Sequence, residues 1–357
     1  MSRSKRVRAL VLLTSLAAVL TVAVTASGLS AAVSGYTVTP LVSDEPGLAP
    51  TTDPHLVNPW GIVAGPTTPW WVANNETDTS TLYNGAGQPF PPATPLVVSV
   101  PGSPTGVVFN GGSQFLVPNG AVMAPARFIF ATQSGTILGW AGGPAAQLGK
   151  DRSSFGASYF GLAIAGDRLY AADFHNRRVE VFDGSFNVVT PPGSFRDPKL
   201  PGGYAPFGIQ AIGGHIFVAY AKQDAAGEDE VTGRGLGAVD EYDANGMLVA
   251  RVEKHAKLNA PWGMAMAPTS GFGPLSGSLI VGNFGDGRLN GFKKDASGQW
   301  QHVDQLRGTN GLAVEIEGLW GIGFGNGGNA GPTDSLFFAA GIDDEAHGLF
   351  GAIRAAS

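Results

Sequence analysis

Polar side chains with oxygen or imidazole groups recur at loop positions that flank a repeated glycine motif. Because equivalent loops of a repeat protein open on the same face, we expect these side chains to surround one mouth of a central channel. A concave mouth with converging polar groups is the usual form of a ligand-binding site. The candidates are Asn58, Asn75, Asp173, His175, Tyr204, Lys222, Asn259, Asn283, Asp286, Glu317, Asp343 and His347.

Four of these candidates suit a hard cation. Carboxylate and amide oxygens are the ligands that Ca²⁺ prefers, so a calcium site at the mouth is one hypothesis. A neutral His175 or His347 beside these carboxylates would serve as a general base or as a metal ligand. The candidate metal ligands are Asp173, Asn283, Glu317 and Asp343.

A structural interpretation of the same residue types competes with the functional one. Asn and Asp at loop starts commonly hydrogen-bond their own backbone and so form turns. Trp60, Trp262 and Trp320 are most simply packing residues, although exposed indole edges would stack on sugars. The acidic segment Asp224–Glu230 is expected to be a solvated excursion. No Gly-x-Ser-x-Gly elbow occurs, so the sequence assigns no nucleophilic triad and no catalytic residue.

Bringing these loops together requires a repeated framework, and the chain carries one. An aromatic residue or threonine, then glycine, then an aliphatic residue occurs six times, with the glycines 45, 55, 47, 55 and 58 residues apart. That period is typical of a four-stranded propeller blade with loop insertions. Glycine suits the innermost strand because backbones crowd around the axis and a Cβ would clash there. The copies are Trp60-Gly61-Ile62, Thr105-Gly106-Val107, Phe160-Gly161-Leu162, Phe207-Gly208-Ile209, Trp262-Gly263-Met264 and Trp320-Gly321-Ile322.

Strand-like segments follow every copy, and helical periodicity is nowhere sustained beyond residue 35. We therefore predict an all-β, six-bladed β-propeller. The sixth copy lacks a fourth strand, whereas the extended segment Tyr36–Val42 belongs to no other blade. We expect this N-terminal strand to complete the last blade and close the ring. The predicted second strands span residues 70–73, 127–132, 168–172, 215–220, 278–282 and 335–340.

The first 35 residues have the layout of a secretory signal peptide followed by a small-residue linker. Basic residues between Arg3 and Arg8 precede an apolar run from Ala9 to Ala26, and small residues follow. We predict cleavage in this region, secretion, and a single propeller domain over residues 36–357. An uncleaved segment that anchors the chain in a membrane is the alternative.

Charge and composition narrow the range of partners. Without the four basic residues of that segment, the chain has 18 basic and 28 acidic side chains, a net charge of −10. A negative surface without a dense Lys/Arg stripe repels phosphate backbones, so nucleic acid is not an expected partner. The chain has no cysteine, so a secreted form must gain its stability from packing rather than from disulfides.

Several segments resemble known propellers. Asn176–Asp183 and Gly285–Phe292 resemble repeats of NHL-like and SMP-30-like six-bladed propellers. From about Leu41 to Ile353 the chain resembles a family of uncharacterised bacterial secreted propellers, in segments such as Asn58-Pro59-Trp60-Gly61 and Asp344–Phe350. This resemblance implies the propeller fold and secretion, and it implies no particular activity.

These observations predict a secreted, monomeric binding or scaffold propeller. Its expected ligand is an extracellular protein, a peptide, a glycan or a small polar molecule. A calcium-type hydrolase, lactonase or lyase that uses the polar mouth is the alternative. A structural component of an extracellular matrix or envelope is a third hypothesis. The predicted closed ring is rigid, and the sequence assigns no set of catalytic residues; both points favour the binding function.

Overall fold

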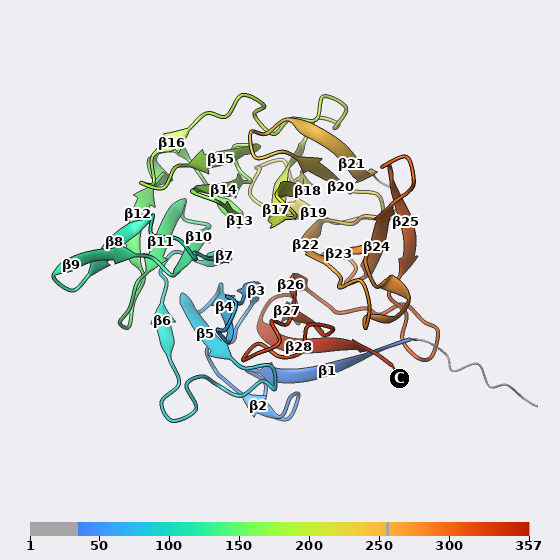
Figure 1. Ribbon diagram of the computed structural model, residues 1–357, viewed down its shortest axis with the longest axis horizontal. Helices are drawn as coiled ribbons and strands as arrows, with labels where there is room; N and C mark the ends of the chain where they lie inside the picture. Colours follow the sequence, from blue (N-terminus) through green and yellow to red (C-terminus); the bar gives the residue numbers. More distant parts are fainter. Residues whose placement is uncertain (1–34, 255–256, 357) are drawn as a thin grey trace, which may run out of the picture. The chain divides into compact units, whose positions relative to one another are not determined.

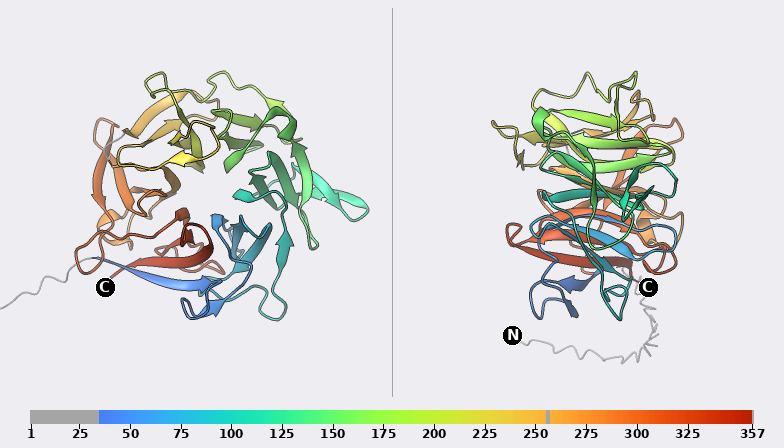
Figure 2. Two further views of the ribbon diagram at one scale, coloured as in Figure 1. Left: turned by 180° about the vertical axis from the view of Figure 1, so that it is seen from behind. Right: turned by 90° about the vertical axis from the view of Figure 1, so that its left-hand side faces the viewer.

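Six β-sheets stand as blades around a common axis (Figure 1). The structure is a computed structural model that describes residues 35–254 and 257–356. Figure 2 shows the same ring from behind and from the side. The prediction of an all-β, six-bladed propeller is confirmed. The predicted signal peptide and linker lie, apart from Gly35, outside the described residues.

In the first three blades the strands follow one another outward from the axis in chain order. Blade 1 contains β3 (Pro59–Val63), β4 (Trp70–Asn74), β5 (Thr79–Tyr83) and β6 (Val97–Ser99). Blade 2 contains β7 (Pro104–Phe109), β10 (Phe128–Thr132), β11 (Thr136–Trp140) and β12 (Gln147–Asp151). Blade 3 contains β13 (Tyr159–Ala165), β14 (Arg168–Asp173), β15 (Arg178–Phe182) and β16 (Val188–Val189).

The other three blades repeat this order, and the last one recruits the N-terminal strands. Blade 4 contains β17 (Tyr204–Ile212), β18 (His215–Gln223), β20 (Gly237–Tyr242) and β21 (Leu248–Lys254), with β19 (Glu230–Val231) paired to β18. Blade 5 contains β22 (Pro261–Met266), β23 (Leu279–Asn283), β24 (Leu289–Lys294) and β25 (Trp300–Gln305). Blade 6 contains β26 (Leu319–Phe324), β27 (Leu336–Ile342), β28 (His347–Ala355), β1 (Tyr36–Ser43) and β2 (Thr51–Thr52).

Some outer strands had no clear signal in the sequence. A hairpin of β8 (Leu116–Asn119) and β9 (Val122–Pro125) is inserted between β7 and β10 and projects from the ring (Figure 1). Like β12 and β16, this hairpin consists mostly of exposed or half-buried residues. Strands without a buried face show no apolar alternation, and this is why the pattern missed them.

Helical structure is confined to two short 3₁₀ turns in the described part of the chain. They are η1 (Ser153–Phe155) and η2 (Gly273–Leu275). Among the described residues, no helix has the length and apolar character needed to cross a membrane.

The N-terminal strand closes the ring, as the sequence predicted. β1 pairs antiparallel with β28, from Tyr36 opposite Ala355 to Ser43 opposite Leu349. The hydroxyl of the buried Tyr36 donates to the Phe272 carbonyl oxygen at 2.9 Å. This bond ties the closing strand to blade 5 as well as to blade 6.

The repeated glycines mark where neighbouring blades touch around the axis. A Cβ on Gly106 would lie 2.2 Å from the backbone nitrogen of Leu162 in the next blade. A Cβ on Gly321 would lie 2.5 Å from the carbonyl oxygen of Trp60, which completes the circle from the last blade to the first. Such distances leave no room for any other residue. Equivalent close approaches join Gly61 to Thr105, Gly208 to Trp262 and Gly263 to Trp320.

Candidate functional site

An aromatic cluster fills the centre of the ring where the inner strands begin. Because its members come from different blades and contact one another, the cluster must cross the axis. Beyond it, a void of only about 20 Å³ is lined by four of the six motif glycines and by the residue that follows the glycine in each copy. The predicted mouth is therefore a blind opening above an aromatic floor rather than the end of a tunnel. We call the cluster the aromatic plug; it contains Trp60, Phe160, Phe174, Phe207, Trp262 and Trp320, with Phe284 packed against it.

Three rings of the plug form a stack that leads toward the mouth. Trp320 stacks on Trp60 with ring centroids 3.6 Å apart, and Phe284 stacks on Trp320 at 4.2 Å. Trp320 is only 1% exposed, Trp60 3% and Trp262 9%. These indoles are packing residues of the plug, and their faces are not available for stacking on a sugar.

The indole nitrogens find partners in the loops of the mouth. Trp320 Nε1 donates to Glu345 Oε1 at 3.1 Å, and Trp60 Nε1 donates to Asn58 Oδ1 at 3.1 Å. Asn58 also hydrogen-bonds the Glu345 carboxylate. The loop after β27 is thereby attached to the plug through one carboxylate.

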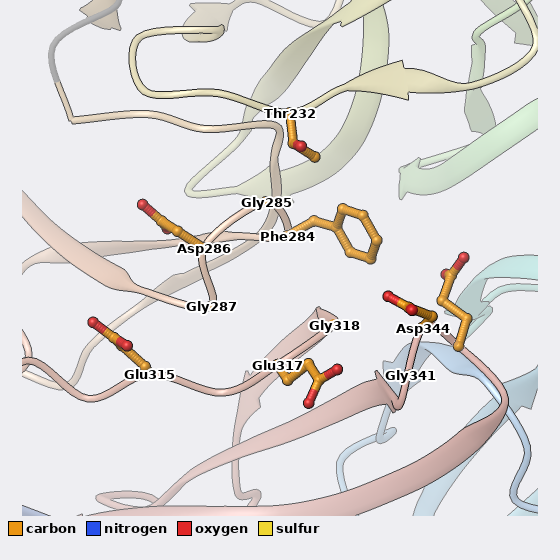
Figure 3. A pocket seen from close by; sticks show the side chains of 11 residues that line it. Thr232, Phe284, Gly285, Asp286, Gly287, Glu315, Glu317, Gly318, Gly341 and Asp344 are labelled. Atoms are coloured by element: carbon orange, nitrogen blue, oxygen red, sulfur yellow. The ribbon is translucent and has the colours of Figure 1, made fainter.

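A pocket of about 460 Å³ opens beside this carboxylate, between blades 5 and 6 (Figure 3). Its volume lies within the range of small-ligand sites. Two loops of blade 6, the β23–β24 loop of blade 5 and the β18–β20 loop of blade 4 contribute to its wall. We call it the mouth pocket; it is lined by Thr232, Phe284, Gly285, Asp286, Gly287, Glu315, Glu317, Gly318, Gly341, Asp344 and Glu345.

Negative charge dominates the mouth pocket. Five of its lining side chains are carboxylates, and no Lys or Arg belongs to the described lining. Arg288 lies at the rim, where its Nη2 pairs with Glu315 at 2.7 Å. The cavity thus has five carboxylates and a single cationic side chain at its rim, so it attracts positively charged groups.

Burial and mutual repulsion raise the pKa of two carboxylates of this region. Burial raises the pKa of Glu345, and the charges of Glu76 and Asp229 raise it further, against hydrogen bonds from Trp320 and Asn58. Burial also raises the pKa of Glu230 to about 7, with added repulsion from Glu345 and Asp229. A carboxylate with such a pKa changes its charge near neutral pH.

The loop that carries Glu230 spans neighbouring blades. We call residues 224–236, between β18 and β20, the mouth strap. His175 Nδ1 lies 3.1 Å from the Gly227 carbonyl oxygen, and Asn259 Oδ1 accepts from Gly233 N at 2.6 Å. The mouth strap is thus held by blades 3 and 5, and the predicted solvated segment Asp224–Glu230 ends in β19, with exposed residues at 225, 226, 228 and 229. Two predicted site residues, His175 and Asn259, act here as its supports.

Two predicted candidates, Asp286 and Glu317, line the mouth pocket. Asp173 and Asn283 instead end the second strands of their blades, as Asn74 does in blade 1. Asp173 is fully buried and accepts from Arg178 Nε at 3.0 Å. Asn283 Nδ2 donates to Asp286 Oδ1 at 3.0 Å. These contacts fit turn formation at repeat-equivalent positions.

The remaining candidates are dispersed around the mouth. Asn75 is buried and donates to Gln133 Oε1 at 3.1 Å, which joins blade 1 to blade 2. Tyr204 is half-buried at the start of β17, opposite the exposed Lys222 of β18. Asp343 is exposed and has a positive φ of 54° in the β27–β28 turn.

His347 belongs to a separate cluster at the ring closure. Its Nδ1 lies 2.7 Å from Asp44 Oδ2 and 3.1 Å from Glu45 Oε1. Asp44 and Glu45 follow β1, whereas His347 begins β28. Among the described His and carboxylate side chains, this is the group of three whose ligand atoms lie within 4.8 Å of one another.

The predicted calcium set is not assembled as such a group. Asp173, Glu317 and Asp343 do not form a cluster of that kind among the described residues. Asp173 is engaged with Arg178, whereas Glu317 faces the mouth pocket. The calcium hypothesis therefore stays a prediction. Of its predicted ligands, Asp173 and Glu317 have different surroundings in the structure.

Sequence reasoning left Phe284 out of the candidates, although the repeat register contained a signal. Phe284 directly follows Asn283 at the end of β23, and Phe174 follows Asp173 at the end of β14. An aromatic residue after the strand-ending polar residue in these two blades indicates a shared direction toward the axis, although in blade 1 Asn74 is followed by Asn75. Asp344 and Glu345 follow the predicted Asp343 by one and two positions in the same loop, and the sequence already placed this loop at the mouth.

Comparisons with known proteins identify relatives of the chain. No family model matches it. An uncharacterised protein of Acanthamoeba polyphaga mimivirus is 32% identical over 338 residues, which cover 90% of this chain and 81% of the relative. A second uncharacterised protein of the same virus is 33% identical over 346 residues, covering 90% of this chain and 86% of the relative. These relatives are viral and do not support the predicted bacterial membership.

Solved structures share the fold at low sequence identity. A catalytically inactive virginiamycin B lyase from Staphylococcus aureus with quinupristin aligns with a TM-score of 0.51 at 11% identity, covering 90% of this chain and 99% of that chain. A glucose dehydrogenase aligns with a TM-score of 0.52 at 13% identity, covering 90% and 99%. A Bacteroides thetaiotaomicron protein of unknown function aligns with a TM-score of 0.54 at 13% identity, covering 90% and 76%. Similarity at this level establishes the propeller fold and carries no activity.

Proposed function

The chain belongs to the same family as these two uncharacterised mimivirus proteins, and from that premise we propose that it is a secreted binding propeller that takes its ligand in the mouth pocket. The expected ligand is an extracellular peptide, protein or glycan that inserts one group into the cavity. The ring serves as a rigid support, and the loops at the mouth supply the contacts.

The observation that carries this proposal is the mouth pocket itself. It is a cavity of about 460 Å³ above a buried aromatic plug, and side chains from blades 4, 5 and 6 converge on it. The plug holds the floor of the pocket rigid, because Trp320 is stacked on both sides and hydrogen-bonded to Glu345. A preformed cavity binds with a smaller entropic cost than one that must be ordered on binding.

A bulky substitution at the pocket wall tests this function. Thr232 is an exposed residue of the wall, so Thr232→Trp fills the cavity without removing a charge or a core contact. Ligands are first found by screening the purified protein against an array of defined peptides and glycans, and their affinities are then measured by biolayer interferometry. We expect Thr232→Trp to weaken binding at least about tenfold.

The matched control is Thr190→Trp, at an exposed threonine after β16 of blade 3. This variant should bind like the wild type. Ligands whose affinity is insensitive to Thr232→Trp would place binding elsewhere on the ring, and an array without any ligand would contradict the binding function.

A metal-dependent hydrolase, lactonase or lyase remains the second candidate, and the five carboxylates of the mouth pocket favour it. Calcium that stays bound in stoichiometric amount through dialysis, together with turnover of a lactone or ester panel that chelation abolishes, would support the enzyme over the binding module. Retention of array binding after chelation would support the binding module.

Secretion is tested separately from binding. Protein recovered from the medium of an expressing culture should begin after the apolar run that ends at Ala26. Recovery of the chain only in membranes, with Met1 at its start, would show an uncleaved anchor.

A further inference from the structure

The mouth pocket combines an aromatic ring with several carboxylates. Phe284 presents an aromatic ring in the lining; this ring also stacks on Trp320 and meets the ring of Phe207 edge-on. Carboxylates of Glu317 and Asp344 stand around the same space (Figure 3), and Glu345 also belongs to the lining. Aromatic rings attract cations through the negative charge of their faces, and carboxylates attract them through full charge.

The spacing of the carboxylates indicates the size of the cation. A calcium site built on three carboxylates brings their oxygens close together, because each ligand lies about 2.3–2.6 Å from the ion. In the described part of the chain, the pocket carboxylates form no group of three within 4.8 Å of one another. A larger, weakly hydrated cation tolerates this wider spacing, and it also makes use of the Phe284 ring.

We propose that the mouth pocket binds an alkylated ammonium group, with its methyl or methylene carbons against Phe284 and its charge among Glu317, Asp344 and Glu345. The inference rests on the proposed binding function and names the chemistry of the ligand group. A quaternary ammonium and the ammonium end of a basic side chain share this chemistry.

Ligand affinity at this site should depend on pH, because Glu230 of the mouth strap changes its protonation near neutral pH. Glu230, with a pKa of about 7, lies among the negative charges of Glu345 and Asp229, and Glu345 in turn is near Glu76. Arg234 of the same strap is exposed, and Arg288 at the rim is paired with Glu315. A cation that enters the pocket stabilises the ionised carboxylates, so its binding releases a proton near neutral pH. Affinity should rise up to about tenfold from pH 6 to pH 8 when one proton is released.

Calorimetric titration of the full chain with choline chloride tests the proposal. The comparison ligands are the uncharged analogue of choline in which carbon replaces nitrogen, and calcium chloride. We expect choline to bind at least about tenfold more tightly than the uncharged analogue. Titrations in buffers of different ionisation heat should show proton release, and the affinity should rise with pH.

Variants locate the binding and provide matched controls. Glu317→Gln and Phe284→Leu should each weaken choline binding about tenfold. Asp304→Asn changes an exposed carboxylate on β25 of the same blade as Phe284, and Phe155→Leu changes an aromatic residue that is 61% exposed. Both control variants should bind choline like the wild type. Circular dichroism of each variant verifies its fold.

Failure of this inference differs from failure of the binding function. Equal binding of choline and its uncharged analogue, or choline binding unchanged by both Glu317→Gln and Phe284→Leu, overturns the ammonium proposal. If array ligands are lost in Thr232→Trp while choline does not bind, the binding function stands and the ligand group is not a cation. Tighter binding of calcium than of choline overturns the proposal in favour of a metal site.

Discussion

The indole ring of Trp60 stacks on that of Trp320, with ring centroids 3.6 Å apart and 17° between the ring planes. Trp60 belongs to β3 of the first blade and Trp320 to β26 of the last. The contact joins the first and last blades at the axis. Trp320 also stacks on Phe284 and donates a hydrogen bond to Glu345, and both of these residues line the mouth pocket. Closure of the ring and the floor of the candidate site therefore depend on the same side chain.

Removal of the Trp320 indole should lower the stability of the fold and weaken ligand binding in the mouth pocket. Trp320→Ala deletes a side chain that is 1% exposed and leaves a cavity in the plug. We expect the free energy of unfolding to fall by about 3–5 kcal/mol in urea denaturation. The control Leu312→Ala, at a residue 67% exposed, should change it by less than about 0.5 kcal/mol. A similar small change for Trp320→Ala would mean that the plug is not a stabilising core.

The number of blades was predictable from the sequence. The backbones of neighbouring blades approach closely at the axis, and this restricts one position in each blade to glycine. Only glycine tolerates the contact between Gly106 and the backbone of Leu162, so each blade repeats the same motif. The closing strand was predictable by elimination, since Tyr36–Val42 had no other blade to join. The outer strands were not, because their exposed residues are free to vary without apolar alternation.

The candidate site was predicted only in part, for a different physical reason. Loop register placed Asp286 and Glu317 at the mouth, but it does not reveal which polar groups pair internally. Asp173 is paired with Arg178, and Asn259 accepts from the mouth strap. The first pairing lies within blade 3 and the second joins neighbouring blades, and both depend on side-chain packing that no repeat pattern encodes. Phe284 was missed because an aromatic residue in a propeller sequence is ordinarily assigned to packing.

The axial glycines give a direct test of the ring. Gly106→Ala would place a Cβ 2.2 Å from the Leu162 nitrogen, so blades 2 and 3 must separate. Overpacking of this kind costs about 1–3 kcal/mol or more, and we expect a lower urea midpoint. Gly202→Ala is the control, because a Cβ there meets no atom within 4 Å. Equal effects of the two substitutions would show that contact at the axis does not determine stability.

The closing strand should contribute through specific bonds as well as through its ladder. Tyr36→Phe removes the hydroxyl that donates to Phe272 O and accepts from Leu275 N. Loss of these buried bonds should lower the free energy of unfolding by about 1–2 kcal/mol, as measured by urea denaturation. Thr37→Ala, at the adjacent exposed position, should have little effect.

Truncation tests the same strand as a unit. A chain that begins at Asp44 lacks β1 and exposes the edge of β28. We expect a loss of several kcal/mol, comparable to the whole stability margin of many domains, together with aggregation through the free edge. An unchanged melting temperature and a monomeric elution profile would refute closure by β1.

The histidine at the ring closure should make stability depend on pH. A hydrogen bond with Asp44 raises the pKa of His347 above its ordinary value of 6.5, and the charges of Asp44, Glu45 and Asp343 raise it further. Because the folded-state pKa is the higher one, the stabilisation is complete below about pH 6.5 and is lost as pH rises through the folded value.

Comparison of wild type with His347→Gln from about pH 5.5 to pH 9 isolates this contribution. The wild type should have the higher melting temperature at the acid end, and the difference should shrink as pH rises. His302→Gln is the control of opposite sign, because burial lowers the pKa of His302 and disfavours its charged form in the fold. Its removal should therefore relieve a destabilisation at acid pH. A difference between wild type and His347→Gln that stays constant across this range would show that the contact between β28 and the residues after β1 does not depend on the charge of His347.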